Sequence, residues 1–185
     1  MPVDSGWTSQ ALDGLCNVQW PVYCFQIPEK KLIFVSDTQR TGNLGGLAGA
    51  DAICQAEAER YDLDGTYKAW LSSSTVAAKD RVTQWPYGYR NADDDVIAIS
   101  WEDLVDGQLS TELNAFADGT PVPSGTAATW TATSESGGYA TPSCSDWTST
   151  SGQGTVGLNT LTSAIWTNWG TRACSELTWM YCIEQ

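Results

Sequence analysis

The fold is decided by residues 42–71, which read GNLGGLAGADAICQAEAERYDLDGTYKAWL. Five residues in this stretch recur at spacings of three and four, which places them on one face of a helix: Ala50, Ile53, Cys54, Ala58 and Tyr61. Asn43 is the expected cap before the helix, and Gly65 stands where a helix commonly stops. Residues 66–71 then read as a short strand. Because a cysteine lies on the inward face, this helix can be joined covalently to a distant element.

The composition indicates one acidic domain, with or without an appendage. The 185 residues include nine basic and 22 acidic side chains, for a net charge of −13, and this length is typical of a single domain. The negative field repels nucleic acid, heparin and anionic membrane surfaces, and no apolar run reaches the length of a membrane span. We therefore expect no nucleic-acid partner, no heparin binding and no membrane insertion.

The cysteines indicate an oxidising compartment. Six cysteines stand at positions 16, 24, 54, 144, 174 and 182, an even set with no Cys-x-x-Cys pair. This spread favours disulfides over zinc knuckles, and disulfides persist outside the cytosol. We expect an extracellular or cell-surface protein. The polar start at residues 1–4 does not resemble a secretory signal, so we expect the export information to lie upstream in the natural protein.

The two ends of the chain carry an internal repeat. Residues 5–26 follow the pattern of residues 163–185, with the same eight-residue cysteine step, and the matching pairs are Trp7 with Trp166, Cys16 with Cys174, and Cys24 with Cys182. Self-similarity of this kind is typical of repeated modules. We therefore divide the chain into an N-terminal segment, residues 1–29, and a domain, residues 30–185. The segment is the tail of a preceding module or a strand-pair donor; a hairpin that converged on a similar pattern is the alternative.

The rest of the chain is a series of short elements and loops. Residues 31–36 read as a β run, and residues 179–183 as a final strand. Ser100 and Gly107 bracket a second short helix, with Asp103 placed to complete a capping box. Residues 72–89 are polar and irregular in pattern.

Residues 106–162 form a long tract rich in Gly, Ser, Thr and Pro, with a β-like stretch at 129–133. Loops of this length in a compact domain are usually functional or disordered. We expect this tract to be ordered, because Trp130, Trp147 and Cys144 lie within it.

The order of these landmarks resembles that of endostatin and, more closely, a bacterial extracellular domain family of unknown function found in spirochaete and other surface lipoproteins. The landmarks are the Gly-rich entry, the helix with Cys54, the strand at 66–71, SWEDL at 100–104, TWTAT at 129–133, CSDW at 144–147 and YCIE at 181–184. Both relatives have the C-type lectin-like fold. The resemblance covers residues 30–185 and implies an α+β fold. In that fold two helices flank two small antiparallel sheets, the termini are adjacent, and a long loop region, pinned by disulfides, lies on one side.

The resemblance also implies the disulfide pairing. Carried onto the matching positions, the family pattern gives Cys54–Cys182 and Cys144–Cys174. The first bridge would join the helix to the last strand across most of the chain, a crosslink worth roughly 4–5 kcal/mol in the loop-closure model. The second would staple the loop region. Cys16 and Cys24 then have only each other, and we predict that they close a small hairpin loop; partners in an upstream module are the alternative.

Calcium is the one cofactor that the residues suggest. Asn91, Asp93 and Asp95 alternate and offer the hard oxygen ligands that calcium prefers. The run lacks the glycine and the distal bidentate glutamate of an EF-hand loop, so a solvated acidic turn is the preferred interpretation. Sugar-binding C-type lectins hold calcium with Glu-Pro-Asn or Gln-Pro-Asp and with Trp-Asn-Asp; this chain has TPVP at 120–123 and WTN at 166–168 instead. Three further residues complete the candidate oxygen ligands: Asp118, Glu135 and Asn168.

The aromatic residues suggest where a ligand binds. Exposed aromatic rings stack on sugars and stabilise protein interfaces, and the chain has ten tryptophans. Four coincide with fold landmarks and are assigned to the core: Trp70, Trp101, Trp130 and Trp147. Four belong to the repeated strands: Trp7, Trp20, Trp166 and Trp179. The candidate ligand face therefore consists of Trp85, Tyr87 and Tyr89, beside the acidic run, with Trp169. Packing within the loop is the alternative for these rings.

We expect a module that binds a glycan or an extracellular protein through its loop side and is not an enzyme. Without histidine no Ser/His/Asp set is possible, and none of the 22 carboxylates stands in a motif that singles it out for acid–base work. The histidines and clustered arginines with which endostatin binds zinc and heparin are missing here. The alternative is structural: the strand pair in residues 5–26 completes a sheet edge of a neighbouring copy and builds a filament or surface layer.

Overall fold

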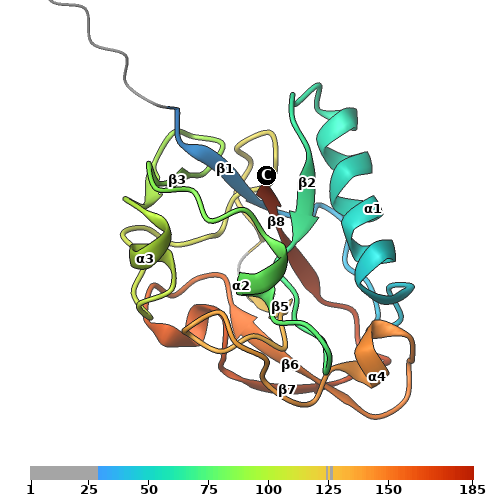
Figure 1. Ribbon diagram of the computed structural model, residues 1–185. Helices are drawn as coiled ribbons and strands as arrows, with labels where there is room; N and C mark the ends of the chain where they lie inside the picture. Colours follow the sequence, from blue (N-terminus) through green and yellow to red (C-terminus); the bar gives the residue numbers. More distant parts are fainter. Residues whose placement is uncertain (1–28, 124, 126) are drawn as a thin grey trace, which may run out of the picture.

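The computed structural model describes residues 29–123, 125 and 127–185 (Figure 1). This part of the chain is a mixed α/β domain with eight strands: β1 (Lys31–Val35), β2 (Tyr67–Ala69), β3 (Tyr89–Arg90), β4 (Val96–Ala98), β5 (Ala128–Trp130), β6 (Gln153–Leu158), β7 (Gly170–Ala173) and β8 (Trp179–Glu184). The long helix is α1 (Gly46–Arg60), and three helical segments have four residues each: α2 (Ala78–Arg81), α3 (Trp101–Leu104) and α4 (Cys144–Trp147). A 3-10 turn, η2 (Ala164–Trp166), precedes β7.

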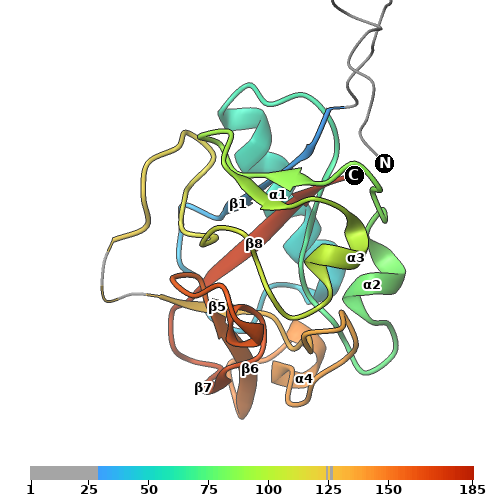
Figure 2. The same cartoon turned by 90° about the vertical axis from the view of Figure 1, so that its left-hand side faces the viewer.

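Strand β8 is the centre of the sheet. The strands follow the order β4-β3-β1-β8-β5-β6-β7, and β2 pairs with β8 outside this path. Along one edge of β8, β1 runs antiparallel to it, with Phe34 opposite Cys182. The other edge pairs first with β5 and then with β2. The last strand of the chain therefore holds three earlier strands together, as Figures 1 and 2 show from two directions.

The sheet differs from the expected pair of small antiparallel sheets flanked by two helices. Two of its strand pairs are parallel, β1 with β3 and β5 with β8, and all eight strands belong to one connected order. Parallel pairing arises because β3 and β5 return to the sheet after long connections rather than through hairpins. The start of β1 lies close to the end of the chain, as expected for adjacent termini of the domain. The Lys31 ammonium donates to the Gln185 backbone oxygen at 2.8 Å.

Helix α1 has the predicted inward face but different ends. Ala50, Cys54 and Ala58 are buried, and Ile53 and Tyr61 pack against the same core cluster. Asn43 is not the cap: it forms an isolated bridge with Thr148. The cap position belongs to Gly45, whose φ of 80° lies in the left-handed region that glycine adopts without steric cost. The helix ends at Arg60, and Gly65, with a φ of 101°, makes the turn into β2 instead.

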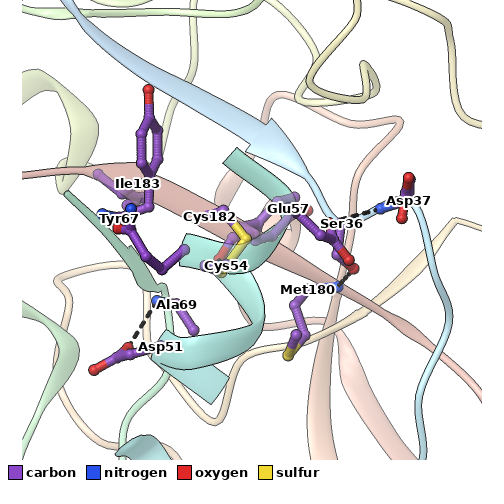
Figure 3. Close-up of a disulfide and its surroundings, with 12 residues drawn as sticks. Ser36, Asp37, Asp51, Cys54, Glu57, Tyr67, Ala69, Met180, Cys182 and Ile183 are labelled. Carbon is purple, nitrogen blue, oxygen red and sulfur yellow. Dashed lines mark hydrogen bonds between the residues drawn. A yellow bond between two sulfur atoms is a disulfide. The ribbon is translucent and has the colours of Figure 1, made fainter. Parts of the chain in front are cut away.

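A disulfide joins α1 to β8, as predicted. Cys54 and Cys182 are bridged across a sequence separation of 128 residues. Figure 3 shows this bridge between the helix and the central strand, with Glu57 on the same side of α1 and Ser36 and Met180 nearby. The Ser36 hydroxyl accepts a hydrogen bond from the Met180 backbone N–H at 3.0 Å. The helix is thus held against the strand on which the sheet depends.

The predicted Cys144–Cys174 bridge is also present, with a sequence separation of 30 residues. It joins α4, which lies inside the tract that the sequence describes as loop, to the residue that follows β7. That tract contains β5 and β6 as well. The predicted stretch 129–133 is strand only as far as Trp130, because Ala132 has a φ of 41° and turns the chain out of the extended region.

The second predicted helix is α3. The Ser100 hydroxyl accepts from the Asp103 backbone N–H at 3.2 Å, as an N-cap does. The Asp103 carboxylate accepts from the backbone N–H of Ile99 at 2.8 Å, one residue before the expected position. The segment 72–89 is more ordered than its pattern suggested, because it contains α2, from which the Arg81 guanidinium pairs with Asp51 of α1.

The four landmark tryptophans lie in the core, as predicted, and Trp166 and Trp179 lie there too. The six, each at most 7% exposed, are Trp70, Trp101, Trp130, Trp147, Trp166 and Trp179. The Trp70 and Trp166 rings are stacked with centroids 5.5 Å apart, and the Trp130 ring meets Trp147 at 5.8 Å. Rings of this size supply large buried areas to a domain with little regular structure.

The predicted N-terminal segment, residues 1–29, lies outside the described residues except for Glu29. The same holds for Trp7, Trp20 and the predicted Cys16–Cys24 bridge. Among residues 29–185 without 124 and 126, no helix is both long enough and apolar enough to cross a bilayer.

Candidate functional site

The most unusual backbone of the domain is the turn at Cys144–Trp147. All four residues have positive φ values, of 51°, 53°, 55° and 68°, and Ser145 and Asp146 have the full left-handed helical conformation. For residues with a side chain this conformation costs roughly 1–2 kcal/mol each. A run of four such residues persists only when the surrounding structure determines it, and strain of this kind is concentrated at functional sites.

Both ends of the turn are fixed inside the protein. The Cys144 side chain is buried in its bridge to Cys174. The Trp147 indole is fully buried, and its Nε1–H donates to the Ser72 backbone oxygen at 2.8 Å. The Trp147 carbonyl in turn accepts from the Leu44 backbone N–H at 2.9 Å. Because the two ends cannot move, Ser145 and Asp146 are presented at the surface in one fixed conformation.

The Asp146 carboxylate is held by Ser74 from a distant loop and by the neighbouring Ser143. Ser74 contributes its hydroxyl at 2.5 Å and its backbone N–H at 2.8 Å, and the Ser143 hydroxyl donates at 2.9 Å. The Ser74 hydroxyl, then the Ser74 N–H, and to a smaller extent Ser143, lower the pKa of the Asp146 carboxyl below its usual range. The group is therefore ionised at neutral pH, which suits an acceptor for ligand hydroxyls and not a general acid.

An aromatic ring completes this group. The Tyr139 hydroxyl lies 3.1 Å from the Ser143 hydroxyl, and the Tyr139 side chain is 39% exposed. We call Ser74, Tyr139, Ser143 and Asp146 the loop-face cluster. Ser143 and Asp146 belong to the start and body of α4, the segment at the lower end of the domain in Figures 1 and 2. The cluster combines an ionised acceptor, two serine hydroxyls and an exposed tyrosine with its own hydroxyl.

Sequence reasoning identified the motif at 144–147 as a fold landmark but assigned no role to its aspartate. Nothing in the pattern predicts that Ser74 meets Asp146, since 72 residues separate them. The order of motifs predicted the turn's place in the chain, but the left-handed backbone that orients the carboxylate has no signature in composition.

The predicted aromatic ligand face is divided between core and surface. Tyr89 is fully buried, so its ring belongs to the core instead of a ligand surface. Tyr87 is 51% exposed, and its ring meets the partly buried Trp85 ring edge-on with centroids 5.4 Å apart. The Lys31 ammonium lies 5.2 Å from the Trp85 ring centroid, in a cation–π contact. Trp85 is thus engaged within the domain, and Tyr87 is the exposed member.

Trp169 remains exposed, as the ligand-face prediction requires. Its side chain is 47% exposed, and the Arg172 guanidinium lies 5.8 Å from its ring centroid. It immediately precedes β7, an edge strand of the sheet order. The Trp169 ring and the Trp85–Tyr87 pair come from different segments.

The predicted calcium run is an acidic turn organised by Asn91. The Asn91 side chain is buried, and its Oδ1 accepts from the backbone N–H groups of Asp93 and Asp95 at 3.0 and 2.9 Å. Its amide group donates to the Asp95 carboxylate at 3.3 Å. An asparagine that bonds the backbone two and four residues onward shapes a turn. The Asn91 side-chain oxygen is therefore already engaged within the turn.

The remaining predicted oxygen ligands have separate environments. The Asp118 carboxylate accepts from the Thr120 backbone N–H at 2.9 Å, and Asp93 lies against Gly119. Glu135 is exposed beside Gly107, and Asn168 is exposed after η2. Within the described part of the chain, no three His, Cys, Asp or Glu side chains are grouped so that they could hold a metal ion. The predicted carboxylates are not gathered into one centre.

Comparison with known proteins places the chain in a family. The family described as "Protein of unknown function (DUF1554)" matches residues 37–163, more than half of the chain. No curated protein matches. The match extends from the end of β1 through α1, α3, β5, α4 and β6, so it includes the whole loop-face cluster. It is compatible with the resemblance to a bacterial family of unknown function. The chain belongs to this family of proteins of unknown function, DUF1554.

Proposed function

We propose that this chain is an extracellular, non-enzymatic binding module with a C-type lectin-like arrangement, and that it recognises a glycan or a protein through its loop face. The observation that carries the proposal is the fixed left-handed turn at Cys144–Trp147, which orients the loop-face cluster. A preformed site loses little conformational entropy on binding. The α1–β8 bridge and the antiparallel pairing of β1 with β8 support the lectin-like arrangement.

A glycan is the favoured ligand. Sugar hydroxyls donate hydrogen bonds to an ionised carboxylate, and the exposed Tyr139 ring offers an apolar face on which a sugar ring can stack. Asp146 retains acceptor capacity, because its Oδ2 atom receives only the Ser74 hydroxyl among the described residues. The two disulfides indicate an oxidising environment, in keeping with exposure to extracellular ligands.

A glycan array with the full chain, with and without calcium, tests this proposal, and a pull-down tests the protein alternative. We expect Asp146→Asn and Tyr139→Ala each to reduce binding by about tenfold, the effect of losing one charged hydrogen bond or one aromatic contact. Asparagine tolerates the left-handed conformation, so the turn is retained. The exposed Asp80→Asn on α2 is the control with the same change of charge. Silence in both assays, or equal binding by Asp146→Asn, would refute the loop face as the site.

A second function, self-assembly by strand addition, is favoured by the sheet edge at β7. This strand pairs with β6 alone in the sheet order, and the exposed Trp169 stands at its start. Unpaired edges accept strands from other chains, and residues 5–26 repeat the pattern of the segment that contains β7 and β8. Light scattering of the full chain and of a variant without residues 1–27 shows whether assembly depends on strand donation by this segment. Assembly that survives the deletion eliminates these residues as the donor.

A further inference from the structure

A hollow of about 290 Å³ lies between helix α1 and the segment that follows β1. The helix contributes an apolar wall of Ala52, Ile53 and Ala56 together with the carboxyl group of Glu57, and the segment contributes Arg40. An apolar wall beside a small number of polar groups is the usual composition of a small-molecule site.

The Glu57 side chain has one oxygen bonded and one without a partner. Figure 3 shows the side chain on α1 close to the chain just after β1, where Oε2 accepts from the Asp37 backbone N–H at 3.0 Å. The Oε1 atom is buried and has no hydrogen-bond partner in the described ranges, although the residue is only 6% exposed. A buried oxygen left without a partner costs free energy. Because Glu57 lines the hollow, a ligand there can supply the missing bond.

Arg40 carries a second unpartnered atom in the same hollow. Its Nε is buried without a hydrogen-bond partner among residues 29–185 outside positions 124 and 126. Every other arginine of the chain pairs with a carboxylate, whereas Arg40 forms no ion pair with any described residue. Its backbone is fixed, because it exchanges two hydrogen bonds with Thr178, at 2.8 and 3.0 Å. A held guanidinium without an anion, in a protein of net charge −13, indicates that the acceptor comes from outside the domain.

The two groups together select a ligand that accepts hydrogen bonds. Burial raises the pKa of Glu57 to about 7, against the opposing charge of Arg40, so the carboxyl is mostly protonated in slightly acidic solution. Since Oε2 already accepts from Asp37, the proton lies on Oε1 and can be donated into the hollow. Arg40 offers N–H donors alone. A carboxylate accepts from both groups, and a short aliphatic stem behind it packs on the apolar wall.

The other charged and titratable groups near Glu57 are already engaged. Arg60 lines the hollow but pairs with the Asp37 carboxylate, which also accepts from the Tyr61 hydroxyl at 2.9 Å. Cys182, on the strand that faces α1, is held in its disulfide. Arg40 is therefore the charge that remains for a ligand.

We propose that this hollow binds the carboxylate of a small organic acid, with Arg40 and Glu57 as the two hydrogen-bond donors and the wall of α1 as the contact for the aliphatic stem. The site shares no residue with the loop-face cluster and does not depend on the function proposed for it. An acidic side chain of a partner protein presents the same group, and the choice of probes separates the two sources.

An NMR titration of the full chain at pH 6 tests the site, with butyrate as the probe. We expect saturable shifts of the Ile53 and Ala56 amide signals. Butyramide, which is neutral and has the same stem, should bind at least about tenfold more weakly, because its bonds to Arg40 lack the anionic acceptor. Acetate, with a shorter stem, should bind about threefold more weakly or worse, and butylamine should cause no shift. Tighter binding of Nα-acetyl-glutamate methylamide than of butyrate would overturn the assignment to a small acid.

Variants separate the two donors. Arg40→Gln should weaken butyrate binding at least about tenfold, whereas Arg90→Gln, which removes the same charge outside the hollow, should not. Butyrate should bind the native chain about tenfold more weakly at pH 8 than at pH 6, because it requires the protonated form of Glu57. Glu57→Gln should retain binding through its amide N–H and lose this pH dependence.

The same spectra show whether each variant is folded, and the ligand series and Glu57→Gln test the site even if Arg40→Gln does not fold. Three results would each overturn the proposal: butyramide or butylamine binding as tightly as butyrate, no saturable shift at either amide, or an unchanged pH dependence in Glu57→Gln.

Discussion

The Glu57 carboxylate accepts a hydrogen bond from the Asp37 backbone N–H at 3.0 Å, just after β1 leaves the sheet. Glu57 is one turn beyond Cys54 on the buried face of α1 and is 6% exposed. Its Oε1 atom is buried without a hydrogen-bond partner among the described residues. Burial raises the pKa of Glu57 from 4.5 to about 7, although the Arg40 guanidinium nearby acts in the opposite direction. This carboxyl makes the stability of the helix depend on pH.

We predict that the domain loses stability as the pH rises from about 4.5 to 7. The folded pKa of Glu57 lies above the unfolded value, so the folded state binds the proton more tightly and its advantage disappears once the pH passes 7. The full effect is at most about 3.5 kcal/mol. Urea unfolding between pH 5 and 8 measures it. Glu57→Gln should flatten the profile, and the exposed Glu59→Gln on the same helix should not; the reverse result would show that other groups cause it.

The two disulfides should contribute unequally to stability. Replacing Cys54 and Cys182 together by alanine should cost about 5 kcal/mol, and replacing Cys144 and Cys174 about 3.5 kcal/mol, because the longer crosslink restricts the unfolded chain more. Denaturant unfolding of the two double variants measures the difference. The second variant should also lose the loop-face cluster, visible as altered amide signals of Ser74 and Asp146, while the first keeps them if it folds.

Glycine at position 145 should stabilise the protein. Ser145 is exposed and has φ and ψ of 53°, which glycine adopts without the steric cost of a side chain. We expect Ser145→Gly to gain up to about 1 kcal/mol and Ser145→Val to lose at least as much. Thermal unfolding checks both. Ser110→Gly, at an exposed position without positive φ, should be neutral or slightly destabilising. A loss of stability in Ser145→Gly would mean that the turn is not strained in solution.

Glycines in β6 and β7 should differ in how well they tolerate replacement by alanine. A Cβ at Gly157 would collide with the Trp166 backbone oxygen, whereas a Cβ at Gly170 would meet no atom within 4 Å. We expect Gly157→Ala to cost about 2 kcal/mol or more, as overpacking does, and Gly170→Ala to change little. Both glycines lie in strands, so propensity alone predicts similar effects. Denaturant midpoints of the two variants distinguish close packing from propensity.

The parts of the fold that were predicted are marked either by a local residue pattern or by the order of motifs along the chain. The inward face of α1 follows from apolar spacing, α3 from its cap, and the two disulfides from the sequence of landmarks. Strand β6 was not predicted, because Gly154 and Gly157 are poor strand residues; they are required there since Cys144, Trp130 and Trp166 approach too closely for a side chain.

The site was harder to predict than the fold. The pattern around Asn91 suits a metal site as well as a turn, and the pattern around Tyr89 suits a ligand face as well as the core. Only the burial of the two side chains distinguishes these alternatives. The loop-face cluster depends on a contact between segments 72 residues apart and on a backbone of reversed hand. Neither is encoded in spacing or composition. The short segments α2, α3, α4 and η2 also have too few residues to show the periodicity by which a longer helix is recognised.

The central position of β8 constrains how this protein can be made. Until residues 179–184 have been synthesised, β1, β2 and β5 lack the strand on which they pair, and Cys54 lacks its partner. A nascent chain that has emerged only as far as β7 therefore cannot close its sheet, and the bridge between α1 and β8 forms only after all seven earlier strands have been made.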